Sequence, residues 1–382
     1  MSSQYRPRVS IPADGERRLD LVREAMHRAQ LDALVVSGSE YTGFDGAVRY
    51  LSGFQIVHRF AYVLVPADGD PAIVFPAEAR YVGRHESAWF EERHFAGTPG
   101  EWLRDRVRGA HRVGVYGLDY VMNVRDYRAL AGGDFSIVPF DEEFDLARAV
   151  KSGEELISVR EAVDINEEGF WTVLGAYEPG KTEAEMMAPA AARFVDLGTG
   201  RHAMNMVLAE GPPGAARPEF VIPSETRKVA AEDLLLYSLE IGGPSGHWAE
   251  VSRPIMAGEA SHATAAMLEA YVEYGEIAQK VMRDGVSAHE VHTACSAPFL
   301  ERGFQLGHVT GHSIGMTMIE HPRIAEGNEA VLRENMVFSM HPHVIGPGGE
   351  CLYMQETWRI GSESGEQLST LPIKIFDGSE SR

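Results

Sequence analysis

The chain of 382 residues is long for a single hydrophobic core, which favours two domains. A content of 44% hydrophobic and 24% charged residues is typical of a globular protein. The formal net charge of −21 would repel both a phosphate backbone and an anionic lipid surface. We therefore expect neither nucleic acid nor a membrane as a partner.

The first residues contain no apolar stretch typical of a signal peptide, and no run of about 18 apolar residues occurs in the sequence. We therefore expect a cytoplasmic protein. Two cysteines, Cys295 and Cys351, are too few for a disulfide framework or a cysteine-based metal site.

Residues 1–150 are predicted to form an α/β domain. Short apolar runs typical of strands alternate with amphipathic segments typical of helices, and this alternation indicates helices packed on a sheet. The predicted strands are 31–38, 60–66, 71–76, 112–117 and 135–140, and the predicted helices are 17–30 and 101–110.

A second domain is predicted over residues 151–382. Between residues 147 and 177 apolar side chains recur at helical spacing, which indicates a long helix at the start of this domain.

An internal repeat marks this second domain. Residues 179–198 and 284–303 each begin a helix after a glycine and end at another, and Thr182 and Ser287 stand at the N-cap positions. The repeat favours a pseudo-twofold α+β domain. Chance similarity of two amphipathic helices would explain the same pattern.

The order of motifs after this point resembles a known family. The helix pair is followed by "DLLLYSLEIGGPSGHWAEVSRPIMAG", "GHSIGMTMIEHP", "NMVFSMHPHVIGPGG" and "YMQETWRIG". Together they resemble the family of creatinase, prolidase, aminopeptidase P and methionine aminopeptidase over roughly residues 145–365. The resemblance implies a pita-bread α+β domain with a pseudo-twofold repeat, preceded by a smaller creatinase-like α/β domain.

The same resemblance bears on metal binding, because metal-dependent members hold two ions with Asp, Asp, His, Glu and Glu. These positions are occupied here by Ser238, Glu250, His312, His341 and Gln355. Hard divalent ions need several anionic oxygens, and two ions about 3.5 Å apart need bridging carboxylates. We therefore expect no two-metal centre, no bound metal and no cofactor.

Creatinase, which resembles this chain in length and domain order, hydrolyses a C–N bond without metal. It has a glutamate where Glu250 stands and a histidine where His312 stands. We therefore predict a metal-independent, creatinase-like hydrolase of a small non-peptide C–N bond of the amide, amidine or urea type. His312, oriented by Glu250, would take a proton from water and return it to the leaving nitrogen. His341 is the third predicted catalytic residue.

Further side chains are predicted to contact the substrate, which we expect to be a small molecule. His308 matches a substrate-facing histidine of the related peptidases, and His321 lies two residues beyond the usual position of another. Arg217 and Phe220 belong to a Pro/Gly-rich segment that resembles a pocket-lining loop. The remaining predicted substrate-binding residues are Ser238, Glu240 and Gln355.

Arg59 links the N-terminal domain to a predicted homodimer. In creatinase-like dimers a loop after a "YxSG" motif reaches the partner's active site, and "RYLSGFQIVHRF" matches that motif here. The guanidinium of Arg59 can hold a substrate carboxylate in a bidentate manner. A surface arginine on a strand edge is the alternative.

Other functions remain open from the sequence. The same His/Glu base would also serve a lyase or an isomerase. A metallopeptidase of the Xaa-Pro type would hold one ion on Glu240, Glu250 and His312, since sliding the first strand by two residues puts Glu240 in the first metal position. A binding pseudoenzyme, as in histone-chaperone subunits, is a further possibility. A purely structural alternative for Glu250 is an ion pair with Arg253 on its strand.

Overall fold

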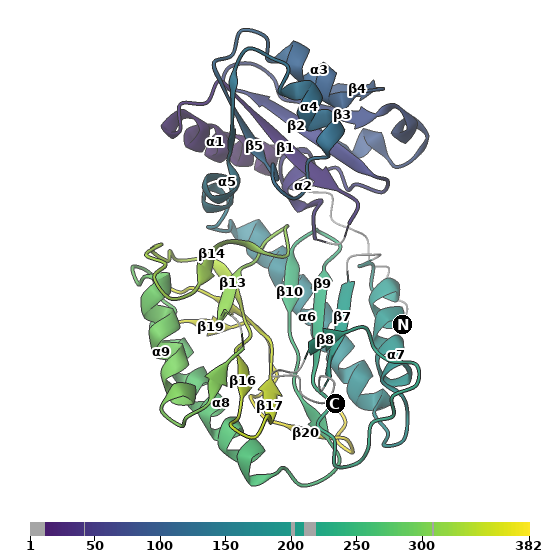
Figure 1. Ribbon diagram of the computed structural model, residues 1–382, viewed down its shortest axis with the longest axis vertical. Helices are drawn as coiled ribbons and strands as arrows, with labels where there is room; N and C mark the ends of the chain where they lie inside the picture. Colours follow the sequence, from purple (N-terminus) through teal and green to yellow (C-terminus); the bar gives the residue numbers. More distant parts are fainter. Residues whose placement is uncertain (1–11, 42, 200–202, 210–218, 308) are drawn as a thin grey trace. The chain divides into compact units, whose positions relative to one another are not determined.

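A computed structural model describes residues 12–41, 43–199, 203–209, 219–307 and 309–382 (Figure 1). These described residues form two compact units. The N-terminal unit extends to Ala149 and includes the later segment Gly315–His321, and the C-terminal unit contains Val150–Ile314 and Pro322–Arg382. Within the described ranges, no helix has the length and apolar character needed to cross a membrane.

The N-terminal unit is built on a mixed sheet in the order β4-β3-β2-β1-β5-β6. Strand β1 pairs in parallel with β5 and antiparallel with β2. Alternate residues of β1, such as Leu34 and Val35, enter apolar clusters on opposite faces, so the sheet is covered on both sides. The strands are Ala33–Ser39 (β1), Phe60–Pro66 (β2), Ala72–Pro76 (β3), Glu92–Ala96 (β4), Arg112–Tyr116 (β5) and Ser136–Pro139 (β6).

The helices of this unit are Pro12–Arg28 (α1), Gly46–Ser52 (α2), Pro99–Arg106 (α3), Val124–Leu130 (α4) and Asp141–Ala147 (α5), with short 3₁₀ turns at Ala77–Tyr81 and His85–Ser87. The predicted strands and helices of this half are thus confirmed. Strand β4 was missed because it is a polar edge strand that lacks the apolar run of the others.

A buried arginine holds the segment Gly315–His321 inside the N-terminal unit. Arg148 Nη1 lies 3.1 Å from Glu320 Oε1, and its Nη2 donates to Thr317 Oγ1 at 2.8 Å and to Asp145 Oδ1 at 2.7 Å. Gly46 meets the same segment, since a Cβ there would lie 1.9 Å from the Met316 carbonyl oxygen. Only glycine fits at that position.

The C-terminal unit pairs helices with curved sheets. Helix α6 packs on β9 and β10 and α7 on β7, whereas α8 contacts β17 and α9 contacts β12 (Figure 1). The helices are Gly153–Ala176 (α6), Glu183–Asp196 (α7), His262–Val281 (α8) and Ala288–Leu300 (α9). The long helix expected at the start of this domain is therefore α6.

The strands of this unit form sheets in the orders β10-β9-β7-β8, β14-β13-β15-β18-β19, β12-β16-β17 and β11-β20. Their bounds are Ala203–Ala209 (β7), Glu219–Val221 (β8), Tyr237–Gly242 (β9), Trp248–Glu250 (β10), Ile255–Met256 (β11), Gln305–Leu306 (β12), Gly311–Ser313 (β13), Glu320–Ile324 (β14), Val337–Met340 (β15), His343–Ile345 (β16), Cys351–Tyr353 (β17), Glu356–Arg359 (β18), Glu366–Gln367 (β19) and Phe376–Asp377 (β20).

The internal repeat is present in the structure down to single hydrogen bonds. Thr182 and Ser287 cap α7 and α9 with reciprocal side-chain and backbone bonds to the glutamate three residues on. The N–H of Gly180 donates to Val229 O at 2.8 Å, and the N–H of Gly285 donates to Leu332 O at 3.0 Å. These two glycines have φ of 94° and 84°, a left-handed conformation that favours glycine. The predicted pseudo-twofold α+β domain is confirmed.

Candidate functional site

Three buried side chains of the C-terminal unit form a cluster that we call the donor triad: Glu250, His312 and His341. One ligand atom from each lies within 4.8 Å of the others. Glu250 ends β10, His312 is the central residue of β13, and His341 follows β15 directly. Because β13 and β15 are antiparallel neighbours, the two histidines come together, with ring centroids 5.0 Å apart.

The carboxylate of Glu250 is fixed at one of its oxygens. Oε2 accepts hydrogen bonds from Ser339 Oγ at 2.6 Å and from Gln355 Nε2 at 3.0 Å. Oε1 lies 3.5 Å from Nε2 of His312. Burial raises the pKa of the Glu250 carboxyl to about 7, although both hydrogen bonds favour its ionised form.

The hydrogen bond of His312 identifies its neutral tautomer. Nδ1 lies 3.0 Å from the carbonyl oxygen of Ser313. A carbonyl can only accept, so Nδ1 carries the proton and Nε2 of the neutral ring presents a lone pair. That lone pair lies beside Oε1 of Glu250, which is also an acceptor. The pair therefore requires a positive species between them, either a proton or a metal ion.

His341 is held through its backbone and by its neighbours. Its N–H donates to the carbonyl of Thr310 at 2.9 Å, and its ring lies 6.3 Å from that of Tyr353. Ser339, the residue that binds Glu250, was not predicted as a site residue. It stands two positions before His341, so the period-two alternation of a strand was the signal that could have found it.

Gln355 lies between two glutamates in the structure. Its Oε1 accepts the backbone N–H of Leu239 at 2.9 Å, so its amide nitrogen must face the other way. Nε2 donates to Glu240 Oε1 at 3.1 Å and to Glu250 Oε2 at 3.0 Å. Burial raises the pKa of Glu240 well above the usual carboxyl range, and the neighbouring charge of Glu250 raises it further.

The register of the strands explains this arrangement. Glu240 lies directly opposite Glu250 in the antiparallel pair β9 and β10, and Ser238 is two residues away on the same face. An isolated antiparallel bridge joins Ser252, two residues after β10, to Gln355, the residue directly before β18. Both halves of the repeat thus contribute side chains to one buried site.

Other predicted residues lie elsewhere or beyond the described ranges. Phe220, on β8, packs against Tyr353 with ring centroids 4.9 Å apart. In the N-terminal unit, Arg59 forms an ion pair with Glu78 at 2.7 Å. His321 is grouped with that unit too, and its N–H donates to Asp145 Oδ2 at 3.0 Å. His308 and Arg217 lie outside the described residues.

The alternative partner of Glu250 is excluded. Arg253 is buried and forms its ion pair with Glu356. It also donates to the carbonyl of Gln355 at 2.7 Å. The alternative pairing of Glu250 with Arg253 is therefore not found between these two described side chains, and Glu250 keeps one oxygen for the donor triad.

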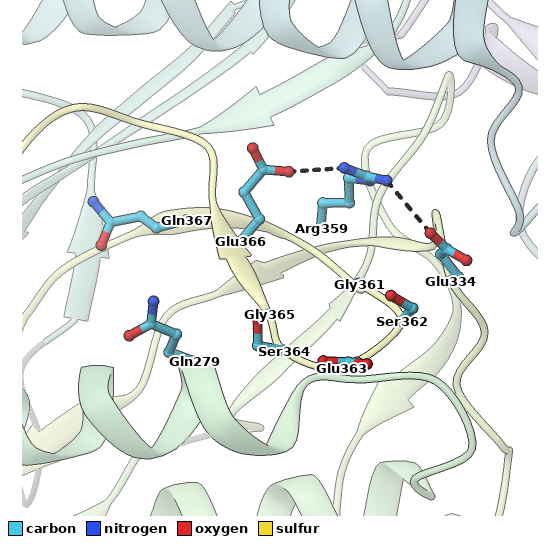
Figure 2. A pocket seen from close by; sticks show the side chains of 10 residues that line it. All are labelled: Gln279, Glu334, Arg359, Gly361, Ser362, Glu363, Ser364, Gly365, Glu366 and Gln367. Atoms are coloured by element: carbon cyan, nitrogen blue, oxygen red, sulfur yellow. Dashed lines mark hydrogen bonds and ion pairs between the residues drawn. The ribbon is translucent and has the colours of Figure 1, made fainter.

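A separate hollow of about 640 Å³ lies beside β18 and β19 (Figure 2). Arg359 on its wall bonds Glu366 at 2.9 Å and lies 3.8 Å from Glu334. The charge of this arginine is already balanced by the two acids, so we assign the hollow no ligand. The candidate site remains the donor triad.

Two family models together match most of the chain. Residues 158–365 match the family model "Metallopeptidase family M24", and residues 18–150 match "Creatinase/Prolidase N-terminal domain". A probable dipeptidase PepE of Mycobacterium tuberculosis is 27% identical over 378 residues, covering 94% of this chain and 96% of the relative. An Xaa-Pro dipeptidase of Pyrococcus furiosus is 22% identical, covering 84% and 90%.

Solved structures agree in fold. The prolidase of Pyrococcus horikoshii superposes with a TM-score of 0.79 at 19% identity, covering 93% of this chain and 98% of that one. Dipeptidase PepE of Mycobacterium ulcerans also gives a TM-score of 0.79, at 22% identity, covering 95% and 98%. The predicted family resemblance and pita-bread fold are confirmed.

The comparisons overturn the predicted reaction. The expected metal-independent hydrolysis of a non-peptide C–N bond is wrong, because the matched family is a metallopeptidase family and the relatives are named as dipeptidases. The prediction of a hydrolase is confirmed at the level of that enzyme class. The physical reason for the error is that imidazole nitrogens ligate metal ions as well as carboxylates do, so His341 in place of a glutamate keeps a ligand.

Proposed function

We propose that this chain, which belongs to metallopeptidase family M24, is a metal-dependent hydrolase that cleaves the peptide bond of small dipeptides of the Xaa-Pro type. The observation that carries the proposal is the donor triad of Glu250, His312 and His341, with ligand atoms within 4.8 Å of one another. Two imidazoles and one carboxylate are a ligand set that zinc takes in catalytic sites, with an open position for water.

The triad fits one ion on two grounds. Ligands of a tetrahedral ion lie about 3.4 Å apart, and His312 Nε2 is already 3.5 Å from Glu250 Oε1. A separation at the 4.8 Å limit of the triad is about 1.4 Å wider than this spacing, so the side chains move inward by up to that amount when they share one ion. The facing lone pairs of His312 and Glu250 also call for a cation. A divalent ion held there supplies a Lewis acid that lowers the pKa of water and polarises a carbonyl.

The chain's own residues supply orientation and a dry environment. Ser339 and Gln355 fix one oxygen of Glu250 and turn the other toward His312. The carbonyl of Ser313 keeps the proton of His312 on Nδ1, which leaves Nε2 as the ligand atom. All three triad residues are buried, and exclusion of water strengthens the interaction of their charges with a cation and a polarised carbonyl.

The substrate class draws support from the names of the relatives and from one aromatic contact. The matched proteins are named Xaa-Pro dipeptidase and dipeptidase. The ring of Tyr353 lies 6.3 Å from that of His341 and packs against Phe220, and aromatic rings of this kind suit contact with a pyrrolidine ring. A homodimer in which Arg59 holds the substrate carboxylate remains part of the proposal, as does a cytoplasmic location.

The test combines metal removal with dipeptide cleavage. We expect protein reconstituted with Zn²⁺, Mn²⁺ or Co²⁺ to release proline from Xaa-Pro dipeptides, and chelation to reduce the rate about 10³-fold or more. The variants Glu250→Gln, His312→Ala and His341→Ala should lose both metal and activity. His27→Ala, which changes an exposed histidine of α1, is the matched control and should retain both. Activity that survives chelation would overturn the proposal.

A further inference from the structure

Two buried glutamates face one another beside the donor triad, and their charge needs compensation. Glu240 and Glu250 are opposite each other on β9 and β10, and both are buried. Two ionised carboxylates on directly opposite residues in a protein interior repel each other unless a cation or hydrogen-bond donors lie between them. The group that compensates the charges of Glu240 and Glu250 therefore decides whether the site holds a second metal ion.

The compensating group in this structure is the side-chain amide of Gln355. Its orientation is fixed by the N–H of Leu239, which donates to Oε1 at 2.9 Å and can bond only to an oxygen. Both amide hydrogens consequently point at the carboxylates, at 3.1 Å from Glu240 and 3.0 Å from Glu250. Gln355 is fully buried, so no water competes for these bonds.

We infer that Gln355 takes the place of a second metal ion and makes this a one-ion centre, an inference that rests on the proposed function. Amide hydrogens occupy the direction from which a cation would approach both carboxylates, and an amide nitrogen that donates two hydrogen bonds has no lone pair to offer a metal. The position also lacks the bridging negative charge that a pair of adjacent ions requires.

The same bonds make Gln355 a positioning residue. Because Oε2 of Glu250 is held by Gln355 and Ser339, Oε1 is the atom that faces His312. Glu240, by contrast, is turned toward the amide and is not a ligand of the single ion. The ligand set is then Glu250, His312 and His341, which differs from the set of Glu240, Glu250 and His312 considered from the sequence.

Counting bound ions tests the inference without reference to activity. Metal-free protein is dialysed against Mn²⁺, bound Mn²⁺ is measured by emission spectrometry, and the spectrum is recorded by electron paramagnetic resonance. Glu250→Gln gives the background from the acidic surface. We expect about one ion per chain above this background, with an uncoupled spectrum, for the wild type and for Glu240→Gln.

The substitution Gln355→Glu restores a bridging carboxylate. It should raise the count to about two ions per chain with a spin-coupled spectrum, and adding Glu240→Gln to it should return the count to about one. Circular dichroism of each variant in Mn²⁺ checks the fold.

The outcomes separate the inference from the proposed function. Two coupled ions in the wild type would overturn the inference and leave the metal-dependent hydrolase standing. A folded Gln355→Glu variant that binds one ion would overturn the role of Gln355. No Mn²⁺ above background in the wild type would overturn the metal site itself. The wild-type count decides the inference even if the Gln355→Glu chain does not fold.

Discussion

Replacing Arg148 by methionine is expected to destabilise the N-terminal unit by about 3–5 kcal/mol, the usual cost of removing one partner from a buried ion pair. The arginine is buried and lies between two buried carboxylates, Asp145 and Glu320. Methionine fills much of the same volume but leaves both acids without their cation. A matched control is Arg160→Met, which breaks an exposed pair with Glu366 and should cost about 0–1 kcal/mol.

The pH dependence of this cost follows from the carboxyl pKa. Burial already raises the pKa of Asp145 to about 6 from an unfolded value of 3.8, and Arg148 is the main influence that lowers it. Without Arg148 the folded pKa rises further. A carboxyl with a raised folded pKa contributes stability below its unfolded pKa and loses that contribution as the pH rises through its folded pKa. The cost should therefore be largest near pH 8 and shrink toward about pH 5.

Urea unfolding followed by circular dichroism, at several pH values between these limits, measures both effects. A cost for Arg148→Met below about 1 kcal/mol, equal to that of the exposed control, would refute the reasoning. So would a cost that does not change with pH, because it would mean that the two carboxylates are not left unpaired in the folded chain.

Three further outcomes follow from the structure. Ser287→Ala removes the N-cap of α9 and should lower the free energy of unfolding by about 1 kcal/mol in urea, where no measurable change would contradict the capping role. Burial raises the thiol pKa of Cys295 and of Cys351 to about 12, so neither should react with a thiol reagent near pH 8 until the chain is unfolded. Rapid labelling of native Cys295 would count against this. Backbone N–H donors lower the pKa of Asp32, so Asp32→Asn should destabilise the protein near pH 7, and the difference should shrink as the pH falls through the lowered pKa and the wild-type carboxyl becomes protonated.

Periodicity made most of the fold predictable. The strands that were found carry apolar side chains on both faces, and α7 and α9 have capping residues at equal places in a repeat. Strand β4 escaped because "ERHFA" is a polar edge strand, whose pairing with β3 is decided by tertiary contacts. Local patterns do not contain that information.

The candidate site was predictable in its residues and not in its chemistry. The motifs pointed to Glu250, His312 and His341, but a count of carboxylates suggested that metal was lost. Motifs in the sequence do not show in which direction each side chain points or which strand it meets. Gln355 faces two glutamates only because Leu239 donates to its oxygen. Ser339, two positions before His341, reaches Glu250 because β15 pairs with β18, where Thr357 lies opposite Ser339 and bonds the backbone of Glu250. Such contacts depend on how strands meet.

The two halves of the repeat in the C-terminal unit each supply part of the donor triad. Glu250 comes from the half that contains α6 and α7, whereas His312 and His341 come from the half that contains α8 and α9. Each half therefore carries an incomplete ligand set, like one partner of a heterodimer fused into a single chain. If the backbone were cut between β11 and α8, at residues 257–261, tight metal binding would report that the two fragments had found each other again.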